Sequence, residues 1–227
     1  RKIMKALFVT GTGTDIGKTY VSAAIAACLV KKHLKIAYYK AALSGALSTE
    51  DSDAGFVYKQ AGLNQDPDTL LSYRYEKPLS PHLAARGEGK YASLDRIIRD
   101  FKSLGEEYDY VLSEGAGGIV CPVVYEPFEK LFYSDIAKAM QAPCVVVADA
   151  GLGTINHTVL TVEYMRNHGL TVAGVILNRY DENSSMHRDN LEMIEAIAHC
   201  KVIAVLPYGG SELQMREKSM EEYFGEV

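Results

Sequence analysis

The chain has 227 residues, of which 48% are hydrophobic and 23% are charged, and its formal net charge at pH 7 is −5. This length and composition are typical of one globular domain that spans residues 1–227. The negative charge, the absence of a basic cluster and the absence of a long apolar run argue against a nucleic-acid or membrane partner.

The cysteines are widely spaced and form no C-x-x-C pair; they are Cys28, Cys121, Cys144 and Cys200. This spacing predicts reduced residues rather than a disulfide framework or a zinc site. The compartment that we expect is therefore the cytoplasm. No signal peptide is expected, because the first strand begins within a few residues of Arg1.

The first predicted elements are a strand, a loop and a helix in direct succession. Ala6–Val9 is an apolar run, residues 10–19 read T-G-T-G-T-D-I-G-K-T, and a helix-forming stretch ends near His33. A buried strand that leads through a flexible loop into a helix presents backbone N–H groups to phosphate. We therefore predict a nucleoside triphosphate site, in which Lys18 reaches the β- and γ-phosphate oxygens and Thr19 ligates Mg²⁺.

This loop is one residue longer than the usual phosphate loop. The usual pattern is G-x-x-x-x-G-K-S/T, which places the first glycine at Thr12, whereas the glycine of this chain is Gly11. Gly11, Gly13 and Gly17 supply conformations and close approach that side chains would block. The alternative is a glycine-rich turn with a chance Lys-Thr pair, and the order of strand, loop and helix disfavours it.

The next segment combines short regular elements with a long loop. Lys35–Lys40 is typical of a short strand, and a loop of small residues follows over residues 41–45. Thr49–Ala54 has the capping residues and acids of a helix N-terminus, and that helix ends at Ala61. Residues 62–89 contain three prolines and no clear period, so we expect a long ordered loop with short pieces of structure. Ser93–Leu104 has apolar residues at helical spacing.

The remaining elements alternate between strands and helices. In chain order we predict strand Tyr108–Glu114, helix Ser134–Met140, strand Cys144–Ala148, helix Asn156–His168, strand Val172–Asn178, helix Ser184–Ala198, strand Val202–Pro207 and helix Glu212–Phe224. This order predicts a P-loop NTPase-type α/β fold, a doubly wound and mostly parallel sheet with helices on both faces. Sites in such sheets lie at the carboxyl ends of the strands, where this chain has Lys40, Glu114, Asp149 and Asn178.

Polar residues at that edge are candidates for a metal site and for the chemistry. Glu114 ends an apolar strand, and with Asp53 and the Thr19 hydroxyl it makes an oxygen set suited to Mg²⁺. Lys40 would place a second ammonium group near the transferring phosphoryl group, beside Lys18. The alternatives are a solvated strand end for Glu114, a helix cap for Asp53 and a solvated lysine for Lys40.

In these residues the sequence resembles the dethiobiotin synthetase family of ATP-dependent ligases. The resemblance runs through most of the chain and includes the long phosphate loop, whose extra residue is a feature of that family. The motifs that carry it are residues 11–19, Tyr39-Lys40 with Ser44-Gly45, Ser52-Asp53-Ala54, Ser80-Pro81-His82, residues 114–118, residues 151–157 and Leu177-Asn178.

The resemblance implies carboxylation and ring closure of 7,8-diaminononanoate. One amine would take up CO2 as a carbamate, ATP would phosphorylate the carbamate, and the second amine would close the ureido ring and expel phosphate. The residues implied to act in catalysis are Lys40, Lys18, Thr14 and Ser44. Those implied to hold Mg²⁺ are Thr19, Asp53 and Glu114.

The resemblance also implies ligand contacts and a homodimer with its site at the interface. ATP contacts would come from Gly13, Thr14, Asp15, Ile16, Gly17, Lys18, Thr19, Tyr20, Asn178 and Pro207. Substrate contacts would come from Thr14, Lys40, Ser44, Gly117, Gly118, Gly151, Gly153 and Asn156, with the loop from Gly151 to Asn156 reaching across the dimer. The chain departs from the family pattern at Ala41, where proline is common, and near Asn190, where a tyrosine that contacts the substrate is expected.

Three other functions would also use a phosphate loop. A deviant-loop partition or positioning ATPase would carry an additional lysine where this chain has Thr12 and Gly13, and would bind DNA or a membrane. A cobyrinate-type amide synthetase would need a glutaminase domain with a catalytic cysteine, for which 227 residues leave no room. A small-molecule kinase would leave the phosphate on its product rather than in solution.

Overall fold

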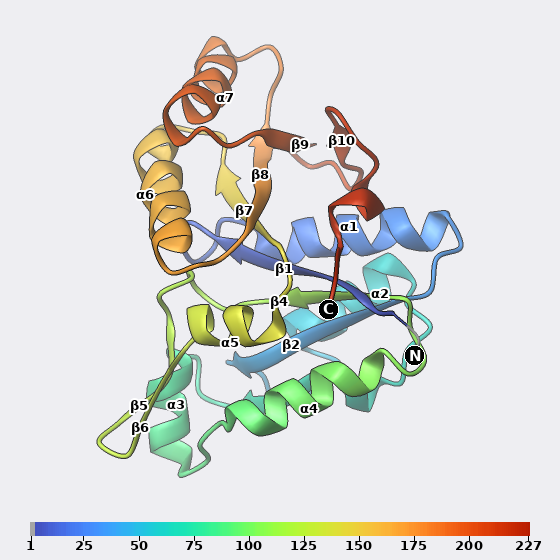
Figure 1. Ribbon diagram of the computed structural model, residues 1–227, viewed down its shortest axis with the longest axis vertical. Helices are drawn as coiled ribbons and strands as arrows, with labels where there is room; N and C mark the ends of the chain where they lie inside the picture. The colour runs from blue at the N-terminus through green and yellow to red at the C-terminus, as the bar shows by residue number, and fades with distance from the viewer. Residues whose placement is uncertain (1–2) are drawn as a thin grey trace.

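The computed structural model describes residues 3–227, and its centre is a mostly parallel sheet (Figure 1). Within these residues the sheet has nine strands, of which eight follow the order β10-β9-β8-β7-β1-β4-β2-β3 while β11 pairs with β1. The strands are β1 (Lys5–Gly11), β2 (Ile36–Ser44), β3 (Leu71–Tyr75), β4 (Tyr110–Glu114), β7 (Cys144–Asp149), β8 (Val172–Tyr180), β9 (Val202–Pro207), β10 (Gln214–Met215) and β11 (Gly225–Glu226). Within this sheet, as described over residues 3–227, only β10 and β11 run antiparallel to their neighbours.

Helices cover both faces of this sheet, as the sequence predicts (Figure 1). One face packs against α1 (Lys18–Lys31) and α2 (Asp53–Ala61). The helices that contribute to the core on the other face are α3 (Pro81–Glu88), α4 (Leu94–Leu104), α5 (Tyr133–Met140), α6 (Thr154–Asn167) and α7 (Ser185–Ala198). The apolar run of β7 supplies both cores in alternation, which explains why it lacks polar residues: Val146 packs on the α5 side and Val145 on the α1 side.

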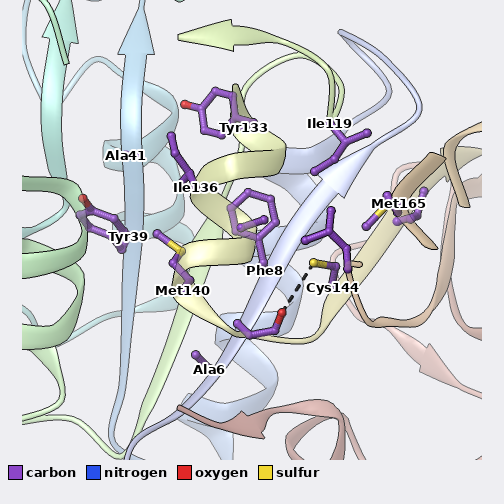
Figure 2. Close-up of a cluster of buried hydrophobic side chains, with 14 of the residues drawn as sticks. Ala6, Phe8, Tyr39, Ala41, Ile119, Tyr133, Ile136, Met140, Cys144 and Met165 are labelled. Carbon is purple, nitrogen blue, oxygen red and sulfur yellow. Dashed lines mark hydrogen bonds between the residues drawn. The ribbon is translucent and has the colours of Figure 1, made fainter. Parts of the chain in front are cut away.

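The core between the sheet and α5 is centred on Phe8 of β1 (Figure 2). Figure 2 shows Phe8 beside Ile136 and Met140 of α5, with Tyr39 of β2 entering from the neighbouring part of the sheet. Phe8 is fully buried. The phosphate loop begins where β1 ends. The packing of Phe8 therefore fixes the position of the first residues of that loop.

Residues 62–89 contain the short pieces that the sequence predicts, but these are regular elements rather than parts of one long loop. The segment contains a 3₁₀ turn (Pro67–Thr69), the edge strand β3 and helix α3. Pro67 and Pro81 occupy the first positions of their helical turns. The N–H group that proline lacks is not needed for a helical hydrogen bond at this position, so both prolines are compatible with the start of a helix. The predicted loop at 41–45 is also mostly strand, because β2 continues to Ser44 along β3.

The predicted helix Glu212–Phe224 is wrong. The segment forms β10 and a 3₁₀ turn (Met220–Tyr223), and it ends just before β11. Its helix-forming residues are overridden by tertiary contacts, because β10 pairs with β9 and the side chains of Met220 and Phe224 are buried in the core on the α1 side.

Two further features complete the fold. Strands β5 (Pro122–Glu126) and β6 (Glu129–Phe132) form a hairpin outside the main sheet, which the sequence analysis did not predict. No helix within residues 3–227 combines the length and apolar character needed to cross a membrane. The expectation about a signal peptide concerns Arg1 and Lys2 in part, and these two residues lie outside the described range.

Phe8→Ala is expected to lower the free energy of unfolding by about 3–5 kcal/mol, because a large cavity would replace a fully buried ring. Urea unfolding followed by circular dichroism measures the change. Phe128→Ala is the matched control, because Phe128 lies in the turn between β5 and β6 with 69% of its surface exposed, and it should change stability by less than about 0.5 kcal/mol. Equal losses in the two variants would contradict this assignment of the core.

Candidate functional site

Strand register brings the predicted polar residues together at one edge of the sheet. Glu114 at the end of β4 is the register partner of Lys40 in β2 and of Val9 in β1. On the other side of β1, Asp149 at the end of β7 is paired with Asn178 of β8. The loop after β1 therefore leaves the sheet between two pairs of polar strand ends.

The phosphate loop adopts a conformation that requires glycine at two positions. Gly17 has φ of 90°, and a Cβ atom there would lie 2.0 Å from Nδ2 of Asn178. A Cβ atom on Gly11 would lie 2.6 Å from Cδ1 of Ile16, so both glycines permit close packing that another residue would prevent. Gly13 differs from the expectation, because a Cβ atom there would meet no protein atom within 4 Å.

Side chains hold this loop from both sides. The Asn178 amide donates a hydrogen bond to the Ile16 carbonyl at 2.9 Å, and the Lys18 ammonium group donates to the Gly13 carbonyl at 2.7 Å. Arg179, which the sequence analysis missed, donates to the Asp15 carbonyl at 2.9 Å. The loop is therefore held in shape by its own lysine and by the end of β8.

Lys40 is the centre of a hydrogen-bond network on the α1 side of the sheet. Its ammonium group lies 2.9 Å from Asp53 Oδ2 and 3.0 Å from Glu114 Oε1. The Thr19 hydroxyl donates to the same Glu114 oxygen at 2.9 Å, and the Tyr38 hydroxyl donates to Glu114 Oε2 at 2.9 Å. Lys40, Tyr38 and Glu114 are almost completely buried. The solvated alternatives for Lys40 and Glu114 do not match this geometry.

Asp53 is at the start of α2 but is not the residue that caps it. The cap is Ser52, whose hydroxyl oxygen accepts a hydrogen bond from the backbone N–H of Gly55 at 3.3 Å. The Asp53 carboxylate is thereby left to pair with Lys40. The helix N-terminus that the sequence predicts at Thr49–Ala54 is confirmed, and it also positions the Asp53 carboxylate beside the buried Lys40 ammonium group.

Burial and neighbouring charges shift the pKa values of the two lysines in opposite directions. Burial lowers the pKa of Lys18, and the positive charge of Lys40 lowers it further. Burial would also lower the pKa of Lys40, but the charges of Glu114 and Asp53 outweigh burial and raise it. For Asp53, burial would raise the pKa, but the Lys40 charge and the hydrogen bond from Lys40 hold it below its usual value. Lys40 and Asp53 are therefore both charged at neutral pH.

The oxygens around Lys40 fit a magnesium ion that is bound together with phosphate. No group of three or more His, Cys, Asp or Glu side chains within residues 3–227 is close enough to hold a metal alone. Mg²⁺ is usually bound by one or two carboxylates and completes its shell with water and phosphate oxygens. Thr19, Asp53 and Glu114 supply such a partial set. The carboxylates of Asp53 and Glu114 already stabilise one positive charge, the Lys40 ammonium group.

Two cavities run along the phosphate loop on this side. The first, of about 500 Å³, is lined by Thr14, Asp15, Gly17, Lys18, Thr19, Tyr20, Asp51, Ser52, Asp53, Phe56, Glu114 and Arg179. The second, of about 340 Å³, is lined by Tyr20, Asn178, Arg179, Leu206, Pro207, Tyr208, Gly209 and Gly210. Tyr20 and Arg179 line both, so the two cavities are adjacent. The first contains the oxygens predicted to hold Mg²⁺, and the second contains Asn178 and Pro207, which the resemblance assigns to ATP.

Comparison with known proteins decides the family. A family model described as "AAA domain" matches residues 5–212. The chain is 48% identical over 220 residues to the ATP-dependent dethiobiotin synthetase of Brachyspira hyodysenteriae, covering 97% of this chain and 99% of that protein. It is 39% identical over 224 residues to an ATP-dependent dethiobiotin synthetase of Clostridium botulinum, covering 97% and 98%. The chain belongs to the dethiobiotin synthetase family.

Solved structures support the fold of this dethiobiotin synthetase family member. The MinC:MinD cell division protein complex of Aquifex aeolicus aligns with a TM-score of 0.55 at 15% identity, covering 90% of this chain and 81% of that chain. A ParA family ATPase from Chlorobium tepidum aligns with a TM-score of 0.54 at 12% identity, covering 91% and 85%. Identities this low show the P-loop α/β fold alone, so they give no support to a partition or positioning function.

A third cavity lies on the opposite side of the phosphate loop, with a volume of about 700 Å³. It is lined by Gly11, Thr12, Gly13, Thr14, Gly117, Gly118, Ile119, Val120, Cys121, Leu160, Thr161, Glu163, Tyr164 and Asn167. Three of the residues assigned to substrate binding in this dethiobiotin synthetase family, Thr14, Gly117 and Gly118, are thus brought together. Lys40, Ser44, Gly151, Gly153 and Asn156, which are assigned to the substrate as well, are not among the residues that line it.

Two other predicted positions have explicit partners. The Ser44 hydroxyl donates to the Leu79 carbonyl at 2.5 Å. Asn190, which replaces the expected tyrosine, is buried and donates to the carbonyls of Ala150 and Gly151 at 2.8 and 3.0 Å. Asn190 therefore anchors the loop after β7 instead of facing an open cavity.

Glu114→Leu is expected to lower the free energy of unfolding by about 3–5 kcal/mol, because it leaves the buried Lys40 charge with Asp53 as its remaining ion-pair partner. Adding Lys40→Met should recover part of this loss, so the two substitutions should be strongly non-additive in urea unfolding. The exposed ion pair Lys59–Glu50 is the control, for which the same cycle should give less than about 1 kcal/mol. Additive losses at Glu114 and Lys40 would show that the two residues are not coupled.

Proposed function

We propose that this chain closes the ureido ring of dethiobiotin from 7,8-diaminononanoate, CO2 and ATP, releasing ADP and phosphate. The observation that carries the proposal is the buried Lys40 ammonium group, which shares the Glu114 carboxylate with the Thr19 hydroxyl beside the phosphate loop. Full-length similarity to named dethiobiotin synthetases supports the same reaction.

The proposed reaction has three steps. One amine of the substrate attacks CO2 and loses a proton, which gives a carbamate. A carbamate oxygen then attacks the γ-phosphorus of ATP and displaces ADP, which gives a carbamic–phosphoric anhydride. The second amine attacks the carbonyl carbon and loses a proton, and the C–O bond to phosphate breaks as the ring closes. None of these steps needs a protein nucleophile, so positioning and charge neutralisation are what the protein supplies.

The two lysines are assigned the charge neutralisation. Lys18 begins α1 at the end of the phosphate loop, where its ammonium group can move from the Gly13 carbonyl to phosphate oxygens. Lys40 is fully charged and is assigned the γ-phosphate and the carbamate. Thr14 and Ser44 are assigned the orientation of the carbamate. Mg²⁺ bound by Thr19, Asp53 and Glu114 would supply charge stabilisation at the β- and γ-phosphate oxygens.

The remaining ligand contacts are proposed from the family resemblance, and the cavities support part of them. Adenine is assigned to the cavity with Asn178 and Pro207, and the triphosphate to the loop residues Gly13, Thr14, Asp15, Ile16, Gly17, Lys18, Thr19 and Tyr20. The diamine is assigned to the cavity with Gly117 and Gly118. Thr14 of the phosphate loop lines this cavity and also the cavity assigned to the triphosphate, so the two cavities share a wall.

We also propose that the working form is a homodimer in the cytoplasm. Leu152, between Gly151 and Gly153, is 92% exposed, and Leu160 and Val120 beside the diamine cavity are exposed as well. A second copy that covers these apolar residues would bring its own Gly151, Gly153 and Asn156 towards the substrate. This arrangement accounts for their absence from the cavity in one chain.

Incubation of the protein with 7,8-diaminononanoate, bicarbonate, Mg²⁺ and ATP is expected to give dethiobiotin, ADP and free phosphate in equal amounts, measured by mass spectrometry and a phosphate assay. Lys18→Gln should abolish turnover, because a neutral amide cannot offset the phosphate charge. Failure of the wild-type protein to form dethiobiotin would overturn the proposed function, and phosphate retained on a product would indicate a kinase.

Lys40→Gln is expected to lower kcat by at least about 100-fold while the affinity for ATP changes by less than about threefold, because Lys40 is assigned to the transition state rather than to nucleotide binding. Single-turnover kinetics and calorimetric titration with a non-hydrolysable ATP analogue separate the two effects. A loss confined to ATP affinity would make Lys40 a binding residue and contradict its catalytic role.

A further inference from the structure

Tyr38 is a buried polar residue of the site for which the proposed chemistry has no use. It lies in β2 two residues before Lys40, so both side chains point to the α1 face of the sheet. Its ring is fully buried, and its hydroxyl donates a hydrogen bond to Glu114 Oε2 at 2.9 Å. A buried phenol hydroxyl needs a hydrogen-bond partner, and the partner here is a predicted metal ligand.

The two oxygens of Glu114 have different partners. Oε1 accepts hydrogen bonds from the Thr19 hydroxyl and the Lys40 ammonium group, whereas Oε2 accepts from Tyr38. The torsion that rotates a glutamate carboxylate is broad and has only a weak intrinsic preference. The Tyr38 hydroxyl therefore fixes which oxygen faces the phosphate loop, and it holds the other oxygen inside the core.

The position of Tyr38 is itself fixed by a side chain outside the site. The Tyr38 backbone N–H donates to Gln65 Oε1 at 2.8 Å, and its carbonyl accepts from Gln65 Nε2 at 2.9 Å. Gln65 is buried and donates a further hydrogen bond to Thr69. Hydrogen bonds thus fix Tyr38 at its backbone and at its hydroxyl. A residue that orients a metal ligand has to be held rigidly in this way.

We infer that Tyr38 is a positioning residue of the site, which holds the Glu114 carboxylate so that Oε1 is presented to the metal–nucleotide complex. The inference rests on the proposed function only in assigning Glu114 to the metal. Tyr38 touches neither ATP nor the diamine in this assignment and acts through Glu114 alone.

Tyr39 provides a matched control on the same strand. Its side chain points to the opposite face, into the core around Phe8 (Figure 2), and its hydroxyl bonds to the Ser72 hydroxyl and the Ile97 carbonyl. Tyr39→Phe therefore removes buried hydrogen bonds from the same strand without touching Glu114. If the buried Tyr38 hydroxyl served only the stability of the fold, Tyr38→Phe and Tyr39→Phe would have the same effect on metal binding.

The test is a titration of each protein with Mn²⁺ in the presence of ADP, followed by the electron paramagnetic resonance signal of free Mn²⁺. Tyr38→Phe keeps the ring and its packing, and it is expected to weaken Mn²⁺ binding about 10-fold or more, the usual effect of losing a hydrogen bond to a metal ligand. Tyr39→Phe should leave Mn²⁺ affinity within about twofold of the wild type. Thermal unfolding of all three proteins verifies that each is folded at the temperature of the titration.

Steady-state kinetics supply the second measurement. Tyr38→Phe should raise the Mg²⁺ concentration needed for half-maximal rate about 10-fold, with the KM for the diamine changed less than about twofold. Unchanged Mn²⁺ affinity in Tyr38→Phe, or an equal loss in Tyr39→Phe, would overturn the inference. Because the titration contains no diamine, it decides the role of Tyr38 separately from whether the wild-type protein forms dethiobiotin.

Discussion

A buried ammonium group keeps its charge only where carboxylates neutralise it, and this constraint organises the site. Lys40 has 2% of its surface exposed and lies between Asp53 and Glu114. Loss of the ammonium group would leave buried negative charge uncompensated, and loss of the carboxylates would leave the buried positive charge of Lys40 uncompensated. Strands β2 and β4 therefore have to keep the register that sets Lys40 opposite Glu114, and α2 has to begin where Asp53 can reach them.

The rest of the site is arranged around this charged centre by the ends of neighbouring strands. β1 delivers the phosphate loop, whose Thr19 hydroxyl shares a Glu114 oxygen with Lys40. β8 holds the far side of the loop through Asn178 and Arg179, which bond to successive loop carbonyls of Ile16 and Asp15. The loop is therefore shaped before nucleotide binds, which reduces the conformational entropy lost on binding.

Sequence patterns predicted the parts of the molecule that depend on local order. The apolar run before residue 10 and the Gly-Lys-Thr sequence after it identified the strand, the loop and the helix, and the two-sided burial of β7 was visible in its uniform composition. The order of alternating elements was sufficient for the fold, because parallel sheets connect through helices. The strand-end position of Glu114 likewise indicated its place at the site.

What the sequence did not predict depends on contacts between distant segments. Strand β3 is specified by pairing with β2 rather than by a period of its own, and the segment after Pro207 follows the pairing of β10 with β9 despite helix-forming residues. Tyr38 reads as one more apolar position in a buried strand until Glu114 is placed beside its hydroxyl. Arg179 is similar, because its hydrogen bond to Asp15 spans most of the chain.

The central position of β1 has a consequence for the order in which the molecule can assemble. β1 is paired on one side with β4 and on the other with β7, and both partners follow it by long stretches of chain. Contacts between residues far apart in sequence form late, because a large loop must close first. During synthesis on the ribosome, the nucleotide loop thus emerges before both strands that flank β1, and it acquires its final shape only after they have paired with β1.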